Sequence, residues 1–290
     1  LLLGLGWIFL PADDLNISRS GNDRCAGTVL ILGNGELIDL GKRQERVVDA
    51  GKGTKIRIGE NVVSYQTGEQ EEAPIQEMNT VRVPRGSEYR LILSDGTKVW
   101  LNAESQLIYP VRFTGENREV IMKGEACFEV AKKEKQPFVV ETFAYDIQVL
   151  GTDFNVIADE AKGQFSTALF EGRVSIHNHR NSERIVMEPN TVVRLENGYL
   201  YVDKLESRDE YLWTEGILSF RNDSFDEIVE KLRKYYNVEI EIRCAALPKV
   251  TYGRLKIRIS EGIEHALRIL QLASDFTYEY DHDRNRIIIQ

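Results

Sequence analysis

The stretch that decides the fold is Tyr89–Leu101, which reads YRLILSDGTKVWL. Apolar and polar residues alternate on both sides of Asp95-Gly96, and alternation with a period of two is typical of a strand with one buried face. An Asp-Gly dipeptide supplies the positive backbone φ that a tight hairpin turn requires. The stretch therefore predicts a β-hairpin with two antiparallel arms.

A related hairpin lies upstream. Residues Thr28–Leu40 read TVLILGNGELIDL and align with Tyr89–Leu101 at an offset of 61 positions. This repeat indicates that one hairpin unit is used twice in a stacked or sandwiched architecture. Short alternating runs and turn signals continue to about Val202, and no segment in between carries an apolar helical stripe. We expect an all-β domain of antiparallel, stacked or sandwich-like hairpins.

The C-terminal part has a different pattern. Ser224 and Glu227 have the spacing of a capping box, which predicts a helix that begins at Phe225. The same order of strand, helix and strand recurs 38 positions later, where Ser260 is placed to cap the second helix. The repeat predicts a small α+β domain of two β-α-β units, with both helices on one face of a sheet.

These changes of pattern and the overall composition bound the organisation of the chain. We expect five parts: residues 1–11 as the end of a transmembrane helix, 12–74 as an N-terminal β-rich segment, 75–202 as the all-β domain, 203–215 as a linker or short helix, and 216–290 as the C-terminal β-α-β repeat domain. The chain has 290 residues and a net charge of -9. Without an excess of Lys and Arg, a nucleic-acid partner is not expected.

The chain opens with an uncharged run, Leu1–Leu10, which ends at Pro11. A helix that spans a bilayer needs about 20 apolar residues, so the run is long enough for about half of one. Trp7 lies near its end, where interfacial aromatic residues gather. We expect the last turns of a membrane span, and a buried apolar N-terminal segment is the alternative.

Two pairs of side chains could carry chemistry. Glu125 and Glu129 share a strand face with Cys127, and two nearby carboxylates would suit hydrolysis, although the solvated face of a half-buried strand is the more frequent case. His177 and His179 would point the same way on a strand, but no acidic or thiol ligand stands beside them in the sequence. We therefore expect neither an enzyme nor a metal site, and no cofactor.

The cysteines and one tryptophan allow two further interpretations. Cys25, Cys127 and Cys244 are too widely spaced for a zinc ribbon or a thioredoxin-like motif, so we expect buried or half-buried free thiols. Trp100 and Tyr89 could form a platform for a sugar ring, but packing against a neighbouring strand or domain is favoured. A carbohydrate-binding or adhesin-like β protein is the alternative function.

A series of motifs resembles the periplasmic part of the FecR family, the iron-dicitrate-type transmembrane sensors that regulate extracytoplasmic-function sigma factors. In chain order the motifs are Val83–Ser87, Leu93–Asn102, Arg118–Val120, Gly124–Ala131, Pro137–Val139, Val149–Val156 and Glu171–Val174. Cys127 departs from the pattern, because family members usually have an aromatic residue there. From about Trp213 the chain is similar to the C-terminal domain of longer FecR-like proteins. That domain is related to the short N-terminal domain of secretins and TonB-dependent receptors, which is itself a repeated β-α-β unit.

The resemblance implies a single-pass inner-membrane anti-sigma factor or co-activator with residues from about 12 onward in the periplasm. A cytoplasmic segment ahead of the span would bind the sigma factor, and the periplasmic part would contact the signalling domain of a TonB-dependent outer-membrane transporter in nutrient or iron uptake. No catalytic residues come with the resemblance. We expect the contact to use strand-edge pairing by the alternating C-terminal strands. Their candidate residues are Leu218, Phe220, Val238, Ile240, Ile242, Phe276, Tyr278 and Tyr280.

Overall fold

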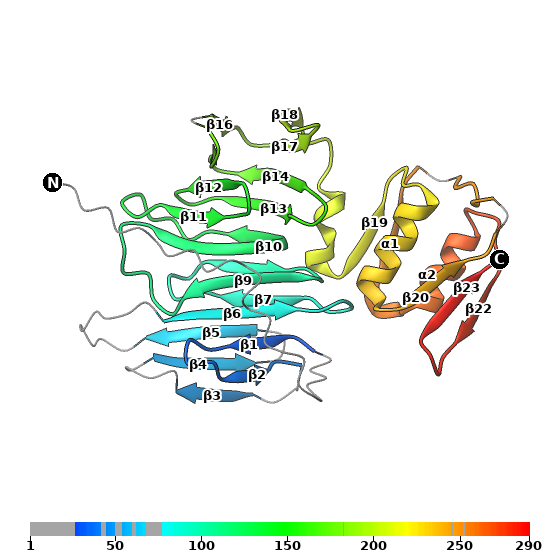
Figure 1. The fold of residues 1–290 in the computed structure, drawn as a ribbon, viewed down its shortest axis with the longest axis horizontal. Helices are drawn as coiled ribbons and strands as arrows, with labels where there is room; N and C mark the ends of the chain where they lie inside the picture. The colour runs from blue at the N-terminus through cyan, green and yellow to red at the C-terminus, as the bar shows by residue number, and fades with distance from the viewer. Residues whose placement is uncertain are drawn as a thin grey trace.

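The computed structural model describes residues 27–41, 45–49, 54–59, 62–67, 77–181, 183–244, 246–251 and 253–290. These residues form two large hydrophobic cores and a small third cluster, and Figure 1 shows a large stack of strands beside a smaller group of helices and strands. We call residues 27–204 the β-body and residues 217–289 the C-terminal unit. The prediction of a β-rich chain is confirmed, whereas Cys25 and the apolar run Leu1–Leu10 lie outside the described residues.

Two sheets make up the β-body and share one strand. The first sheet has the order β2 (Leu37–Asp39), β1 (Val29–Ile31), β6 (Met78–Val83), β9 (Ser105–Pro110), β10 (Arg118–Glu129), β11 (Phe138–Glu141), β12 (Tyr145–Val149), β15 (Val174–Asn178) and β16 (Arg184–Met187). The second has the order β3 (Arg46–Asp49), β4 (Thr54–Gly59), β5 (Val62–Thr67), β7 (Tyr89–Ile92), β8 (Lys98–Leu101), β10, β13 (Asp153–Asp159), β14 (Gln164–Glu171), β17 (Thr191–Glu196) and β18 (Tyr199–Lys204). Alternate residues of both sheets form one core, as period-two burial requires.

The shared strand β10 bends as it passes from one sheet to the other. Its first half pairs with β9 and β11, and its second half pairs with β8 and β13. Gly124 lies at the change with a φ of 88°, and a Cβ on it would be 2.7 Å from the Glu104 carbonyl oxygen. Only glycine tolerates both conditions. Alternation in the sequence predicts two separate strands here, Arg118–Met122 and Ala126–Ala131, whereas the structure has one continuous strand that bends at Gly124.

The two copies of the repeated hairpin have the same strand register. Leu30 pairs with Ile38 in β1 and β2, and the equivalent residues Leu91 and Val99 pair in β7 and β8. All four side chains are buried in the core between the sheets. The first copy belongs to the first sheet, where β2 is a terminal strand, and the second copy lies inside the second sheet.

A fully buried ion pair fastens the turn of the second copy. Arg118 Nη1 is 2.7 Å from Asp95 Oδ2, and the two side chains are 0% and 1% exposed. Arg118 also donates to the carbonyl oxygens of Ala131 and Gln136, while Asp95 accepts from the Thr97 hydroxyl at 2.8 Å. Buried charges persist only with such partners. The pair joins the β7–β8 turn to the start of β10 and to the loop that follows it.

The C-terminal unit contains the two predicted β-α-β repeats. The first comprises β19 (Ile217–Phe220), α1 (Phe225–Tyr236) and β20 (Glu239–Ile242), and the second comprises β21 (Leu255–Arg258), the short 3₁₀ helix η2 (Ile259–Glu261), α2 (Ile263–Gln271) and β22 (Tyr278–Asp281), followed by β23 (Arg286–Ile289). Helix α1 begins at the predicted capping box: Glu227 N donates to Ser224 Oγ at 3.3 Å and Ser224 N donates to Glu227 Oε2 at 2.7 Å. Asn237, with a φ of 50°, ends the helix.

Two details of this unit differ from the prediction. The strands form two sheets, β19–β21 and β20–β23–β22, instead of one, because the first strands of the two repeats pair with each other and the last strands pair separately. Ser260 does not cap α2: it lies within η2, and Gly262 occupies the N-cap without a side-chain hydrogen bond.

Residues between the two cores pack as a 3₁₀ helix, η1 (Asp209–Glu215). Tyr211 and Trp213 of η1 are buried against the outer face of the second sheet, in a small cluster with Cys127, Ala168, Phe170 and Val192. The segment predicted as a linker or short helix is therefore a packed helix that touches the β-body just before β19 begins.

Candidate functional site

The carboxylate of Glu125 lies where the β-body meets the C-terminal unit. It accepts hydrogen bonds from Asn102 Nδ2 at 2.7 Å and from Trp213 Nε1 at 3.0 Å, and Asn155 Nδ2 lies at 3.4 Å. Lys234 Nζ, from α1, is 3.1 Å away and forms an ion pair with it. The Glu125 side chain is only 13% exposed. Charge-assisted hydrogen bonds are stronger than neutral ones, and this carboxylate connects the β-body with η1 through Trp213 and with α1 through Lys234.

The last turn of α1 makes two further contacts with the β-body. Tyr235 OH accepts from Asn102 Nδ2 at 2.8 Å, and Gly86 N donates to the Lys234 carbonyl oxygen at 2.8 Å. A Cβ on Gly86, whose φ is 70°, would lie 2.8 Å from the Cβ of Asn237, so the close approach requires glycine. We call Gly86, Asn102, Glu125, Trp213, Lys234 and Tyr235 the junction.

Burial determines the protonation of the groups packed around the junction. Loss of solvent raises the pKa of the Tyr235 hydroxyl well above its ordinary value, and it raises the pKa of the Cys127 thiol in the same way. Asn155 Nδ2 donates to Cys127 Sγ at 3.2 Å. Because the thiolate is the nucleophilic form, a buried thiol with a raised pKa serves in packing. Cys127 and Cys244 are free thiols, as the spacing predicted.

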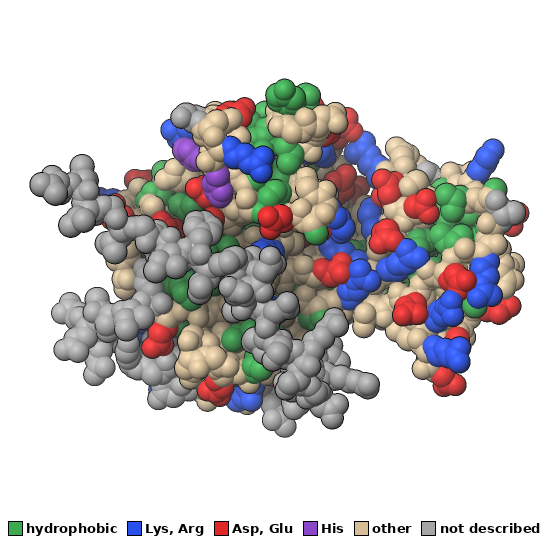
Figure 2. Space-filling model, viewed as in Figure 1, with side chains coloured by type: hydrophobic (Ala, Val, Ile, Leu, Met, Phe, Trp, Pro, Cys, Tyr) green, Lys and Arg blue, Asp and Glu red, His purple; other side chains and the backbone are tan. Residues whose placement is uncertain are grey.

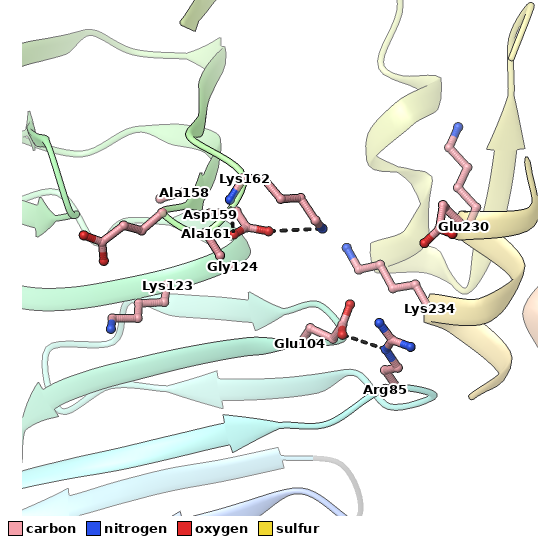
Figure 3. A pocket seen from close by; sticks show the side chains of 12 residues that line it. Arg85, Glu104, Lys123, Gly124, Ala158, Asp159, Ala161, Lys162, Glu230 and Lys234 are labelled. Atoms are coloured by element: carbon pink, nitrogen blue, oxygen red, sulfur yellow. Dashed lines mark hydrogen bonds and ion pairs between the residues drawn. The ribbon is translucent and has the colours of Figure 1, made fainter. Parts of the chain in front are cut away.

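A cleft of about 700 Å³ lies beside the junction, between the β-body and α1. It is lined by Arg85, Glu104, Lys123, Gly124, Ala158, Asp159, Glu160, Ala161, Lys162, Glu230, Lys231 and Lys234. Figure 3 shows Lys162 and Lys234 extending into the cleft from its two walls. Arg85 is 2.6 Å from Glu104, and Lys162 is 3.1 Å from Asp159. Both signs of charge line the cleft, so its surface is suited to a hydrated contact between two parts of the chain.

The residues predicted to bind a partner lie mostly in the core of the C-terminal unit. Buried residues of the set are Leu218, Phe220, Val238, Ile240 and Phe276, while Ile242, Tyr278 and Tyr280 are partly buried against them. The five buried side chains are therefore not available as a contact surface, and those of Ile242, Tyr278 and Tyr280 are available only in part. Strand-edge pairing uses backbone groups instead, so it requires a strand whose N–H and C=O groups are unpaired on one side.

Strand β22 presents such an edge. Thr277 N donates to Gln290 O at 3.0 Å and Gln290 N donates to Thr277 O at 2.9 Å, which makes them a hydrogen-bonded pair. Backbone groups in an antiparallel strand point alternately to either side, so the N–H and C=O groups of Tyr278 and Tyr280 point away from β23. Within the described residues β22 pairs with β23 alone.

The other C-terminal strands are less accessible. Strand β23 lies between β20 and β22 and has no edge. Side chains of α1 cover the backbone of two further strands: Arg233 donates to the Ile240 carbonyl oxygen of β20, and Lys231 Nζ donates to the Ser219 carbonyl oxygen of β19 at 3.2 Å. Of the strands predicted to bind a partner, β22 therefore has the most open backbone.

The carboxylates that sequence analysis weighed for hydrolysis do not form a pair. Glu125 belongs to the junction, and Glu129 lies 2.6 Å from Lys98 on the exposed surface. The expectation that both lie on a solvated face was wrong for Glu125, because η1 covers that part of β10. No local sequence pattern predicts the burial of Glu125, since its partners Trp213 and Lys234 come from distant segments.

The histidines and the suggested sugar platform also have other partners. His179 Nε2 is 2.8 Å from Asp146 Oδ1, an acidic neighbour that the sequence did not place beside it, and His177 Nε2 is 3.0 Å from Ser175 Oγ. In the described part of the chain no group of three or more His, Cys, Asp and Glu side chains is arranged to hold a metal ion.

The suggested platform does not present two open aromatic faces. Tyr89 is buried in the core of the β-body, and the Arg90 guanidinium lies 4.9 Å from the centre of the Trp100 ring. Packing, the favoured interpretation for Trp100, agrees with its contact with the η1 cluster.

Comparison with known proteins finds matches to two family models and to solved structures. The model described as FecR protein matches residues 79–175, and the model described as FecR, C-terminal, matches residues 217–289. Two crystal structures of a candidate anti-sigma factor from Parabacteroides distasonis, at 1.65 and 2.50 Å resolution, have TM-scores of 0.61 and 0.62. Each is 27% identical in sequence and the match covers 73% of this chain and 98% of that chain. No curated protein sequence matches.

Among the described residues, no helix combines the length and apolar character needed to cross a membrane.

Proposed function

We propose, from the premise that this chain belongs to the FecR family, that it is the periplasmic part of a single-span inner-membrane regulator of an extracytoplasmic-function sigma factor. The regulatory class rests on the two family matches and on the likeness to a candidate anti-sigma factor. We further propose that the chain relays a signal from a TonB-dependent outer-membrane transporter through protein–protein contact.

The free edge of β22 is the observation that carries this proposal. An extended segment of the transporter's signalling domain would add to the β20–β23–β22 sheet and would satisfy the outward backbone groups of Tyr278 and Tyr280. Exposed side chains on the outer face of β22, Glu279 and Asp281, would favour a partner strand with basic residues.

Contacts within the chain connect this edge to the β-body. Phe276, just before β22, packs edge-to-face on Phe225 of α1 with 5.5 Å between ring centres. At the other end of α1, Lys234 and Tyr235 belong to the junction. A shift of α1 on partner binding would therefore act on Glu125 and β10, and through them on the segment that leads to the membrane.

A binding measurement tests the proposal. A change of side chain alone would leave the backbone N–H of the strand edge in place. We therefore choose Tyr280→Pro, which removes one outward backbone donor without removing a β22–β23 hydrogen bond. The matched control is Tyr280→Phe, which keeps the backbone N–H and loses only the hydroxyl bond to Asn285 at 2.7 Å. Both variants are checked for folding by circular dichroism.

Calorimetry with the purified signalling domain of the cognate transporter should show binding at tens of micromolar or tighter. We expect Tyr280→Pro to weaken it at least about tenfold, the equivalent of 1.4 kcal/mol, and Tyr280→Phe to have little effect. Absence of binding by the unaltered chain would refute the transporter partner, and equal binding by both variants would refute the β22 edge.

A further inference from the structure

The end of the β-body formed by β16 and β18 exposes apolar side chains. Tyr199 is 70% exposed, Tyr201 46%, Val202 52% and Val186 49%. These strands end the two sheets: β16 pairs only with β15, and β18 pairs only with β17, among the described residues. Figure 2 shows hydrophobic side chains gathered at the top of the view, where Figure 1 places β16 to β18. Exposed apolar residues on a terminal strand are typical of an interaction surface.

The backbone of β18 can accept another strand. Leu205 N donates to Asn190 O at 2.8 Å, which sets the alternation of the β17–β18 ladder. It follows that Tyr199, Tyr201 and Asp203 direct their backbone groups toward β17, whereas Leu200, Val202 and Lys204 direct theirs away from the sheet. Among the residues that the structure describes, no strand pairs with these three successive outward N–H and C=O sets.

We propose that this edge binds a second copy of the chain, with β18 antiparallel to the partner's β18 about a twofold axis at Val202. In this register the backbone groups of all three outward residues form hydrogen bonds with the β18 strand of the second copy. Val202 pairs with the partner's Val202, and Leu200 pairs with the partner's Lys204. The two second sheets then continue into one sheet across the axis. A shared surface of this kind is the usual form of a symmetric dimer.

The charges and the turn of β18 favour this antiparallel register over parallel pairing and over shifted antiparallel registers. At the proposed register Asp203 lies opposite the partner's Tyr201, so its carboxylate can accept from a phenol hydroxyl. Parallel pairing in register would place Asp203 beside the partner's Asp203, and like charges on directly neighbouring positions are destabilising. Shifting the antiparallel strands by two residues in one direction would pair Lys204 with Gly198, which belongs to the β17–β18 turn and has a φ of 83°. A shift by two residues in the other direction would place Asp203 opposite the partner's Asp203. The self-complementary pattern is the reason to assign a second copy to this edge.

One substitution tests the backbone part of the proposal. Val202→Pro removes an outward N–H and leaves the β17–β18 hydrogen bonds intact, because Val202 and Val193 form a non-hydrogen-bonded pair. Val202→Thr is the matched control, since it keeps both the N–H and the branched side chain. The mass in solution is measured by light scattering after size exclusion from about 10 to 200 µM, against 33.2 kDa for one chain.

We expect the unaltered chain and Val202→Thr to approach twice the monomer mass as concentration rises, and Val202→Pro to remain monomeric. A monomeric unaltered chain at 200 µM overturns the proposal. Species larger than a dimer also overturn it, because they would indicate end-to-end stacking onto β2 and β3, where Leu37 and Val47 are 52% and 58% exposed.

A disulfide tests the register. Cα atoms of a hydrogen-bonded antiparallel pair lie about 5.5 Å apart, within the range that a disulfide can bridge. In a chain with Cys25→Ser and Cys244→Ser, Val202→Cys should give a covalent dimer under mild oxidation. Tyr199→Cys, at a position of the same strand that is more exposed than Val202, should give at least about tenfold less. Equal cross-linking by the two variants, or none by Val202→Cys, contradicts the twofold axis at Val202.

Discussion

The two copies of the repeated hairpin have the same backbone and different surroundings. In each, the glycine of the turn donates to the residue three positions earlier: Gly35 N to Leu32 O at 2.8 Å, and Gly96 N to Leu93 O at 3.0 Å. In each, the residue before the glycine accepts from the N–H two positions later, Asn34 at 2.9 Å and Asp95 at 3.0 Å. Asn34 is exposed, whereas the Asp95 side chain is 1% exposed and paired with Arg118.

The difference shows that local sequence determines the shape of the turn and that position in the sheet determines its importance. A turn at a terminal strand keeps water around its side chains, so an amide suffices. The equivalent turn inside the second sheet is covered by the loop after β10, and a carboxylate there needs a buried cation. Breaking a buried pair costs far more than altering an exposed group.

Arg118→Met should have the largest effect. It leaves the Asp95 carboxylate buried without its cation, and we expect the free energy of unfolding to fall by about 3–5 kcal/mol. Urea unfolding followed by tryptophan fluorescence measures it, since Trp100 lies in β8. A loss below about 1 kcal/mol would mean that the pair is not important for the stability of the second hairpin.

Asp95→Asn converts the second turn to the chemistry of the first. The side-chain oxygen can still accept from Thr97 N, but Arg118 loses its countercharge, so we expect a loss of about 2–4 kcal/mol. In the double variant Arg118→Met with Asp95→Asn the loss should be smaller than the sum of the single losses. Additive losses would contradict a direct interaction.

Gly35→Ala and Gly96→Ala should destabilise by the same amount, about 1 kcal/mol each. Their φ values are 85° and 89°, and a Cβ at either would meet no atom within 4 Å, so only backbone strain is added. The same urea experiment compares them. A much larger loss at Gly96 would show that the covering of the second turn also restricts its backbone.

Asn34→Asp should have the smallest effect, within about 0.5 kcal/mol, because water solvates the new charge. It is the matched reverse of Asp95→Asn. A loss as large as that of Asp95→Asn would show that the two turns differ in more than their burial.

Patterns of short range predicted much of the fold. The hairpin at Tyr89–Leu101 and the helix that begins at Phe225 depend on neighbours in sequence, so the residues themselves contain the signal. The type of turn was predicted less well. In these two hairpins only the glycine has a positive φ, because three residues lie between the bonded pairs Leu32 and Glu36, and Leu93 and Thr97, and a loop of this length needs a positive φ only at its last residue.

The junction could not be predicted in this way. Glu125 and Lys234 are 109 positions apart, and each occupies a place in its own element where a solvated charge is the ordinary expectation. Their approach depends on η1, whose sparse apolar residues Tyr211 and Trp213 carry no periodicity. The sequence predicted that a C-terminal strand edge binds the partner, but it did not identify β22 as that strand. The choice depends on the α1 side chains that cover the backbone of β19 and β20, and these contacts are visible only in the three-dimensional structure.

The bent strand β10 has a consequence for how the β-body opens. Each half of its backbone lies between two strands of its own sheet, so fraying of the outer strands of either sheet does not free its amide hydrogens for exchange. Local openings elsewhere would leave it protected, and both of its halves would exchange only when the whole β-body unfolds. We therefore expect the two sheets to unfold as one cooperative unit, with β10 as its slowest-exchanging segment.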